Sequence, residues 1–164
     1  MAKIDIIRNT YGGLEYLHNA LEYVTDYRAL YNVGYGVNPY DTEMAYNQML
    51  YTRQYFGKVS GNPLVHIVVA YNNQVKDIET AAYYGQQCAQ YFAPRFQVLS
   101  CNHKKDEHCC QFHTHLIINS VSYINGQMIK TGYDDMYAYC KYVEQVTGQR
   151  CWFYFENKAV YNGV

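Results

Sequence analysis

Two histidines separated by one residue, His113 and His115, are the side chains in this sequence best suited to binding a metal ion. They lie in residues 111–119, QFHTHLIIN, whose apolar second half is typical of a buried strand. Side chains two positions apart point to the same face of a strand, so the two imidazoles are expected to stand side by side. The spacing therefore predicts half of a metal site.

A metal ion bound by two histidines needs a third ligand, and the segment before this strand offers several. His103 would complete three neutral nitrogens and leave coordination positions open for substrate oxygens and water. Cys109 or Cys110 would instead supply a thiolate and favour a closed structural zinc site. We expect His103 to complete the site formed by His113 and His115. The other candidates for the third position are His108 and Asp106.

Composition and charge narrow the class of protein. The chain has 164 residues, 49% of them hydrophobic, so we expect a single domain over residues 1–164, possessing one core, whether whole or the N-terminal part of a longer protein. The start lacks the apolar run of a signal peptide, and no stretch reaches the roughly 18 apolar residues of a membrane span. We therefore expect a cytoplasmic protein with no membrane partner. The net charge of -1 argues against a simple polyanion binder, whereas the 21 tyrosines offer stacking surfaces for bases.

Hydrophobic periodicity and turn residues divide the chain into alternating strands and helices. Strands are expected near 3–8, 64–71, 95–101, 112–122 and 151–155, with a return strand at 127–130 after the turn at Asn125-Gly126. Helices are expected near 14–27, 41–56, 77–92 and 133–147, two of them capped by Asp41 and Asp77. Loops are expected at 28–40 and 102–110. The hairpin requires antiparallel pairing, so this order predicts an α+β fold with an antiparallel-rich central sheet and helices packed on it.

The first predicted helix has two distinct faces. Its apolar stripe, expected to be buried, consists of Leu14, Leu17, Leu21 and Val24. At 100° per residue, the opposite side carries Tyr16, Tyr23 and Tyr27. A phenol on that side would face solvent or a cleft, where it could reach a substrate.

These motifs together resemble those of relaxases, the single-strand nucleases that start conjugative plasmid transfer and belong to the HUH endonuclease superfamily. The segment 103–119 resembles their histidine motif, and residues 20–24, ALEYV, resemble the helix that carries the nucleophile. Residues 65–71 resemble the strand between them, and residues 120–126, SVSYING, match the hairpin of the MobP-like branch. The order, tyrosine first and histidines later, is the relaxase order. The resemblance implies a fold of the HUH-endonuclease (relaxase) type.

The resemblance also implies an activity: site- and strand-specific nicking and rejoining of single-stranded DNA at the transfer origin of a plasmid or conjugative element. Tyr23 would be the nucleophile that forms a 5′-phosphotyrosine intermediate, and Tyr27 is the alternative. His103, His113 and His115 would hold a divalent metal ion, manganese or magnesium, with zinc as the alternative. Accessory relaxosome proteins are the other expected partners.

His66 lies in the middle of the predicted strand 64–71. The resemblance places it close to the active site, where it would orient the phosphate or assist proton transfer. From its neighbours alone, a core histidine with one satisfied nitrogen is an equal alternative.

Two other classes of protein fit some of these residues. The first class is a binding module that cleaves nothing. It would be either a zinc-stabilised module that combines Cys109 or Cys110 with the histidine pair, or a catalytically silent relaxase relative that keeps the fold and only binds DNA. RNA ligase-like phosphoesterases also carry histidines on two strands, here His66 and His115. Their chemistry needs a hydroxyl two residues after each histidine, and Val68 and Ile117 have none. The sequence therefore excludes the second class.

Overall fold

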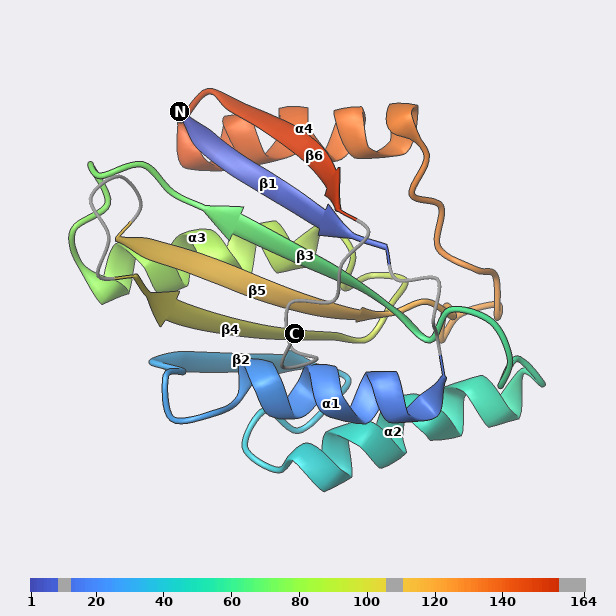
Figure 1. The fold of residues 1–164 in the computed structure, drawn as a ribbon. Helices are drawn as coiled ribbons and strands as arrows, with labels where there is room; N and C mark the ends of the chain where they lie inside the picture. The colour runs from blue at the N-terminus through green and yellow to red at the C-terminus, as the bar shows by residue number, and fades with distance from the viewer. Residues whose placement is uncertain (9–12, 106–110, 157–164) are drawn as a thin grey trace.

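The computed structural model describes residues 1–8, 13–105 and 111–156 (Figure 1). Its six strands in those residues are β1 (Ala2–Ile7), β2 (Tyr31–Tyr35), β3 (Leu64–Ala70), β4 (Val98–Lys104), β5 (Phe112–Asn119) and β6 (Cys151–Glu156). The helices there are α1 (Leu14–Val24), α2 (Thr42–Tyr55), α3 (Ile78–Gln90) and α4 (Tyr133–Thr147). None of the helices in these residues is long and apolar enough to cross a membrane.

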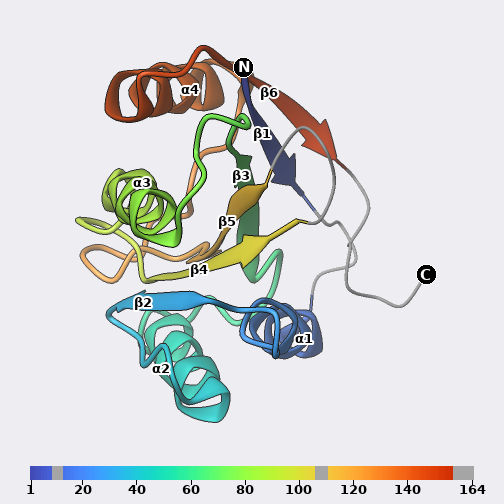
Figure 2. The same cartoon turned by 90° about the vertical axis from the view of Figure 1, so that its left-hand side faces the viewer.

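The strands form one sheet in the order β2-β4-β5-β3-β1-β6. Neighbouring strands are antiparallel, except that β1 and β6 are parallel. Helices α3 and α4 cover one face, and α1 and α2 lie on the other (Figure 2). The expected α+β fold with an antiparallel-rich sheet is confirmed.

Each face of the sheet has its own hydrophobic core, and β5 contributes to both. Leu116 and Ile118 pack into the core under α3 and α4, whereas Ile117 packs into the core under α1 and α2. Because side chains alternate along a strand, His113 and His115 point to the same face as Ile117, toward α1. The alternation places the two histidines on the side of the sheet that carries the first helix.

Helix α3 packs tightly behind the histidine strand. A Cβ atom on Gly85 would lie 2.9 Å from Thr114 Oγ1 and 3.1 Å from Asn102 Oδ1. Thr114 Oγ1 accepts from Asn102 Nδ2 at 2.9 Å and pairs with the Tyr71 hydroxyl at 2.6 Å. Asn102 Nδ2 also donates to the Ala81 carbonyl of α3 at 3.0 Å. This buried polar network ties β4, β5 and α3 together directly behind His113 and His115.

The predicted helix starts are confirmed by their caps. The Asp41 side chain accepts from the Met44 N–H at 3.0 Å, and the Asp77 side chain accepts from the Thr80 N–H at 2.7 Å. Each bond satisfies one backbone N–H that has no partner within the first turn of its helix. These local sequence signals were therefore sufficient to locate the starts of α2 and α3.

The expected loop 28–40 is wrong in part, because Tyr31–Tyr35 form β2. Among the described strands β2 pairs with β4 alone, and it is half-exposed. It therefore has no need of the continuous apolar pattern of an inner strand. Gly34 also interrupts it, and a Cβ there would meet the Val37 carbonyl oxygen at 2.0 Å. An edge strand containing glycine has the composition of a loop.

Several other boundaries differ from expectation: α1 ends at Val24 and not at Tyr27, and β4 begins at Val98 and not at Arg95. Strand β4 extends to Lys104, so 102–104 belong to the sheet and not to the predicted loop, because their backbone pairs with β5. The turn at Asn125-Gly126 exists, with Gly126 at φ +72°. However, its two arms share only the isolated bridge between Val121 and Met128, and the predicted return strand 127–130 does not form.

Candidate metal centre and active site

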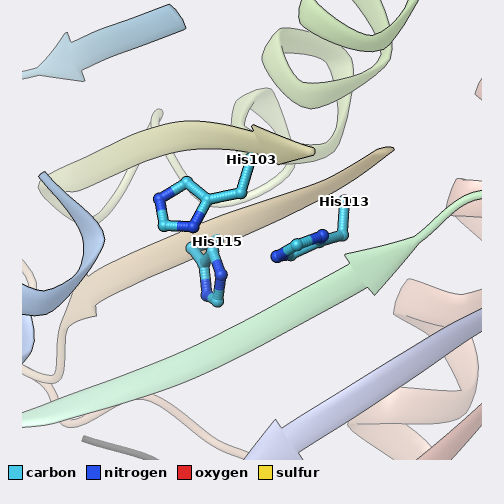
Figure 3. A group of neighbouring side chains, drawn as sticks. All are labelled: His103, His113 and His115. Carbon is cyan, nitrogen blue, oxygen red and sulfur yellow. The ribbon is translucent and has the colours of Figure 1, made fainter. Parts of the chain in front are cut away.

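Three histidines meet at one end of the central strands β4 and β5 (Figure 3). Cross-strand pairing places His103 directly opposite His113, and His115 follows on the same face of β5. Their ring centroids are 4.4 to 5.5 Å apart, and one nitrogen from each ring lies within 4.8 Å of the others. The structure brings together the three residues that the sequence singled out as ligands. Asp106, His108, Cys109 and Cys110 lie outside the residues that the structure describes.

The hydrogen bonds of the three rings determine which nitrogens are available to a cation. His103 Nε2 donates to the Val24 carbonyl at 2.8 Å, and a neutral imidazole with a proton on Nε2 keeps a lone pair on Nδ1. His115 Nδ1 lies 2.8 Å from His66 Nε2. His115 Nε2 and His113 Nδ1 are buried without a hydrogen-bond partner. Because buried polar atoms normally have partners, this donor set fits a divalent metal ion with imidazole affinity.

Burial keeps these ligands neutral. It lowers the pKa of His113 to about 3, lowers the pKa of His115 well below its usual value, and lowers that of His103. Repulsion among the histidines and from Arg28 acts on the pKa of His113 and His115 in the same direction. A neutral imidazole is the form that coordinates a metal, so these lowered pKa values favour the form that can bind one.

His66 lies beneath the centre, on β3, and has no solvent exposure. Burial, with a smaller contribution from the neighbouring histidines, lowers its pKa to about 3. If His115 presents Nε2 to a cation, its Nδ1 carries the proton and donates to His66 Nε2. His66 is thus placed to fix the tautomer and the orientation of a ligand ring.

Helix α1 ends at this centre. Its carbonyl at Val24 accepts the bond from His103, and the half-buried Tyr23 ring meets the His115 ring edge-on, with centroids 5.7 Å apart. The Tyr27 side chain is 94% exposed and lies beyond the end of the helix. Of the three tyrosines expected on the outer side of the helix, Tyr23 is the one that contacts the histidines.

The expectation for Tyr16 was wrong. Its side chain is 6% exposed and belongs to the core between α1, α2 and the sheet. Tyr16 points away from the leucine stripe, as the helical periodicity predicts, but α2 packs against α1 on that side. A side of the helix that would face solvent in isolation is therefore partly covered.

Two functional candidates were missed by the sequence reasoning, both in the turn after α1. Arg28 binds the Asp26 carboxylate through Nε and Nη2, at 3.1, 3.0 and 2.7 Å. The guanidinium also lies 4.7 Å from the centroid of the Tyr23 ring. The bond to Asp26 is the main cause of the raised pKa of Arg28, and Tyr23 contributes. The available signal was a cation five residues after Tyr23, in a turn that looked like a polar linker.

Two other features of the described residues do not form a comparable centre. His18 lies between Glu22 and Glu43 on the outer side of α1 and α2, and both of its ring nitrogens face carboxylates. The hydrogen bond to Glu43 raises the pKa of His18, as expected for an exposed ion pair. A cavity of about 590 Å³ runs along α2 past Met44 and Tyr51, but none of the three clustered histidines lines it.

Comparison with known proteins agrees with this geometry. The sequence profile of the relaxase family described as "MobA/VirD2-like, nuclease domain" matches residues 16–152. The chain belongs to this family. A relaxase nuclease domain nicks DNA and binds it as a single strand, and the family generally uses a divalent metal ion.

The relaxase domain is also similar to a solved structure. That structure was reported in a study of the molecular basis of vancomycin resistance transfer in Staphylococcus aureus, and the TM-score is 0.60 over 90% of each chain. The sequence identity is 13%, so this similarity shows a shared fold and not shared residues. No curated protein matches the sequence. The family match extends from α1 into β6 and so spans Tyr23, His66 and the three clustered histidines.

Proposed function

We propose that this relaxase domain nicks and rejoins single-stranded DNA by metal-dependent transesterification, with Tyr23 as the nucleophile. The contact between the Tyr23 and His115 rings, with centroids 5.7 Å apart, carries the proposal. This contact supports a nucleophilic role for the Tyr23 phenol, beside a histidine cluster whose buried nitrogens suit a cation. The proposed substrate is the transfer origin of a plasmid or conjugative element, at which accessory relaxosome proteins would assist.

His103, His113 and His115 would hold the metal ion. When bound, a divalent cation supplies Lewis-acid stabilisation of the negative charge that develops on the scissile phosphate. Three imidazoles favour a transition metal, whereas magnesium prefers oxygen ligands. We therefore propose manganese ahead of magnesium, with zinc as the competitor that binds the same nitrogens.

Tyr23 Oη would attack the phosphorus atom of the scissile phosphodiester. A bond forms between phosphorus and Oη as the bond from phosphorus to the 3′ oxygen breaks. The phenol loses its proton, and the departing 3′ oxygen gains one to become a 3′-hydroxyl. The product is a 5′-phosphotyrosine. Because one phosphodiester replaces another, attack by a 3′-hydroxyl reverses the step and reseals the strand without a nucleotide cofactor.

Two further side chains support this step. The Arg28 guanidinium, held by Asp26 and 4.7 Å from the Tyr23 ring centroid, stabilises negative charge on Oη and on the phosphate. His66 has no exposed surface, so we assign it the positioning of His115 in place of contact with the phosphate.

A covalent-adduct assay tests the proposal. The protein is mixed with manganese and a labelled, single-stranded oligonucleotide pool of random sequence, and adducts that survive denaturation are separated on a gel. Sequencing the captured strands identifies the preferred site. We expect an adduct with the native protein and none with Tyr23→Phe or His113→Ala.

Tyr27→Phe is the matched control, because Tyr27 is the alternative nucleophile and its side chain is 94% exposed. It should form the adduct as the native protein does. An adduct that persists in Tyr23→Phe would exclude Tyr23 as the nucleophile. Manganese binding to His113→Ala, measured by calorimetry, tests the metal centre independently of cleavage.

A further inference from the structure

The face of the sheet that carries the metal centre continues across β3 and β1 to the edge strand β6. Cross-strand pairing places His113 opposite Ala70, Ala70 opposite Lys3, and Lys3 beside Trp152. Paired residues project their side chains to the same side of a sheet. Trp152 therefore belongs to the same row as a proposed metal ligand, at the outer edge of the sheet, where its ring also meets the ring of Tyr137 on α4, with centroids 6.3 Å apart.

The adjacent row repeats this arrangement. His115 pairs with Val68, Val68 with Asp5, and Asp5 with Tyr154. Each row crosses three strand spacings of about 4.8 Å, which is about 14 Å from β5 to β6. A stacked strand carries one phosphate about every 3.4 Å, so the rows span about four nucleotides, or fewer if the strand is extended.

This part of the face is accessible in the described residues. Along β6, Cys151 and Phe153 are buried on the α4 side, whereas Trp152 is 38% exposed and Tyr154 is 44% exposed. Helix α1 lies toward β4 and β5, and no described helix covers β1 and β6 on this side (Figure 2). The two exposed aromatic side chains therefore stand at the β6 edge of the face that carries the proposed metal centre, with Tyr154 beside Lys3 on that face.

A cation accompanies the two rings. Lys3 Nζ lies 5.2 Å from the centroid of the Tyr154 ring and 3.0 Å from Asp5 Oδ1, and half of its side chain is exposed. Aromatic faces stack with bases of any sequence, and an ammonium group neutralises a phosphate. With a net charge of -1, the chain has little general attraction for a polyanion, so stacking must supply a large part of the affinity.

We propose that Trp152, Tyr154 and Lys3 form a binding surface for single-stranded DNA, here called the aromatic edge, which holds the strand a few nucleotides from the scissile phosphate. Bases stack on the two rings, and Lys3 contacts the backbone. The position relative to the scissile phosphate rests on the proposed function, whereas binding of the single strand does not.

The chain has one tryptophan and 21 tyrosines, so emission excited at a wavelength that only tryptophan absorbs reports on Trp152. The experiment titrates Tyr23→Phe, which prevents covalent capture, with oligothymidylate and follows tryptophan emission. We expect saturable quenching as bases stack on the indole, and none with a blunt duplex of the same length. Unchanged emission at saturating oligothymidylate, with binding established by anisotropy of the labelled strand, would overturn the proposal.

Variants then measure the contribution of each side chain by anisotropy. Trp152→Ala and Tyr154→Ala should each weaken binding about 5- to 150-fold, the range for loss of one stacked base. Trp152→Phe keeps a ring and should bind nearly as the native protein does. Lys3→Ala should lower the slope of log affinity against log salt by about 0.7.

The matched control is Tyr83→Ala. Its ring is 56% exposed on α3, which covers the opposite face of the sheet, so binding should not change. If Trp152→Ala fails to fold, Tyr154→Ala and the quenching of Tyr23→Phe still decide the question. Native affinity in Tyr154→Ala together with no quenching in Tyr23→Phe would refute the aromatic edge.

The two proposals fail in different ways. Quenching without any covalent adduct in the native protein would refute the nicking reaction and leave the aromatic edge as a single-strand binding surface. An adduct that forms normally while emission and affinity are insensitive to these variants would refute the aromatic edge alone.

Discussion

Replacing His66 with leucine tests whether strand β3 positions a ligand of the proposed metal centre. His66 Nε2 lies 2.8 Å from His115 Nδ1, and His66 is fully buried. Leucine is similar in size but cannot accept a hydrogen bond. For His115 Nε2 to bind metal, His115 Nδ1 must carry the proton. In His66→Leu this buried N–H has no acceptor, which costs about 1–3 kcal/mol. That cost corresponds to roughly 5- to 150-fold in an equilibrium constant, and loss of a comparable partner of a metal-binding histidine lowers metal affinity about 10- to 100-fold.

Calorimetric titration of manganese into metal-free protein measures this effect without any need for DNA. His66→Leu should bind manganese about 10- to 100-fold more weakly than the native protein, and His66→Gln should recover part of the loss because its amide oxygen can accept. Val65→Ala is the control, since Val65 is buried on the same strand but belongs to the core on the opposite face. It should lose stability and keep its metal affinity. Native manganese affinity in His66→Leu would refute the positioning role of His66.

Three further predictions concern packing, charge and pH. Gly85→Ala forces a methyl group to within 2.9 Å of Thr114 Oγ1, so urea denaturation should show an unfolding free energy lower by about 1–3 kcal/mol; an unchanged midpoint would contradict this tight packing. Arg28→Ala should slow adduct formation by about 100-fold or more, with Arg28→Lys retaining part of the rate because it keeps the charge but not the fork; equal rates in the native protein and Arg28→Ala would exclude the proposed charge stabilisation. In metal-free protein, the pKa values of His66 and His113 are lowered to about 3, whereas an unfolded histidine titrates near 6.5, so the unfolded chain binds more protons in acid. Their contribution to stability is therefore complete above about pH 6.5 and declines toward about pH 3. Thermal melts across this range should show a shallower decline for His66→Leu.

Much of the fold was predictable because the decisive signals are local. The caps Asp41 and Asp77 and the apolar run of β3 each depend on a few neighbouring residues. Strand β2 was not predictable in this way, because it is defined by backbone pairing with β4 while its side chains are half-exposed. The same holds for the end of β4, where Asn102 and His103 are polar yet 2% exposed. Their burial depends on a polar network and a histidine cluster built from distant segments.

The site was predictable to a similar degree. The spacing of His113 and His115 indicated a pair of ligands because strand alternation is a local property. The contact of Tyr23 with His115 joins residues 92 positions apart, and only the family resemblance selected Tyr23 from its helix. The role of Arg28 depends on how the chain turns after Val24. That turn brings the Arg28 guanidinium over the Tyr23 ring, and hydrophobic periodicity does not predict the path of a turn.

The polar network of Tyr71, Asn102 and Thr114 has a consequence for the accuracy of assembly. A slip of one residue in the pairing of β5 would turn every side chain of that strand to the other face. Thr114 would then leave its partners unsatisfied, and His113 and His115 would point into the packing under α3. The network is complete in one register, so it discriminates against mispaired sheets with similar hydrophobic content. If the proposed metal site is correct, the fraction of folded protein that binds one equivalent of manganese counts the molecules in which β5 has paired correctly.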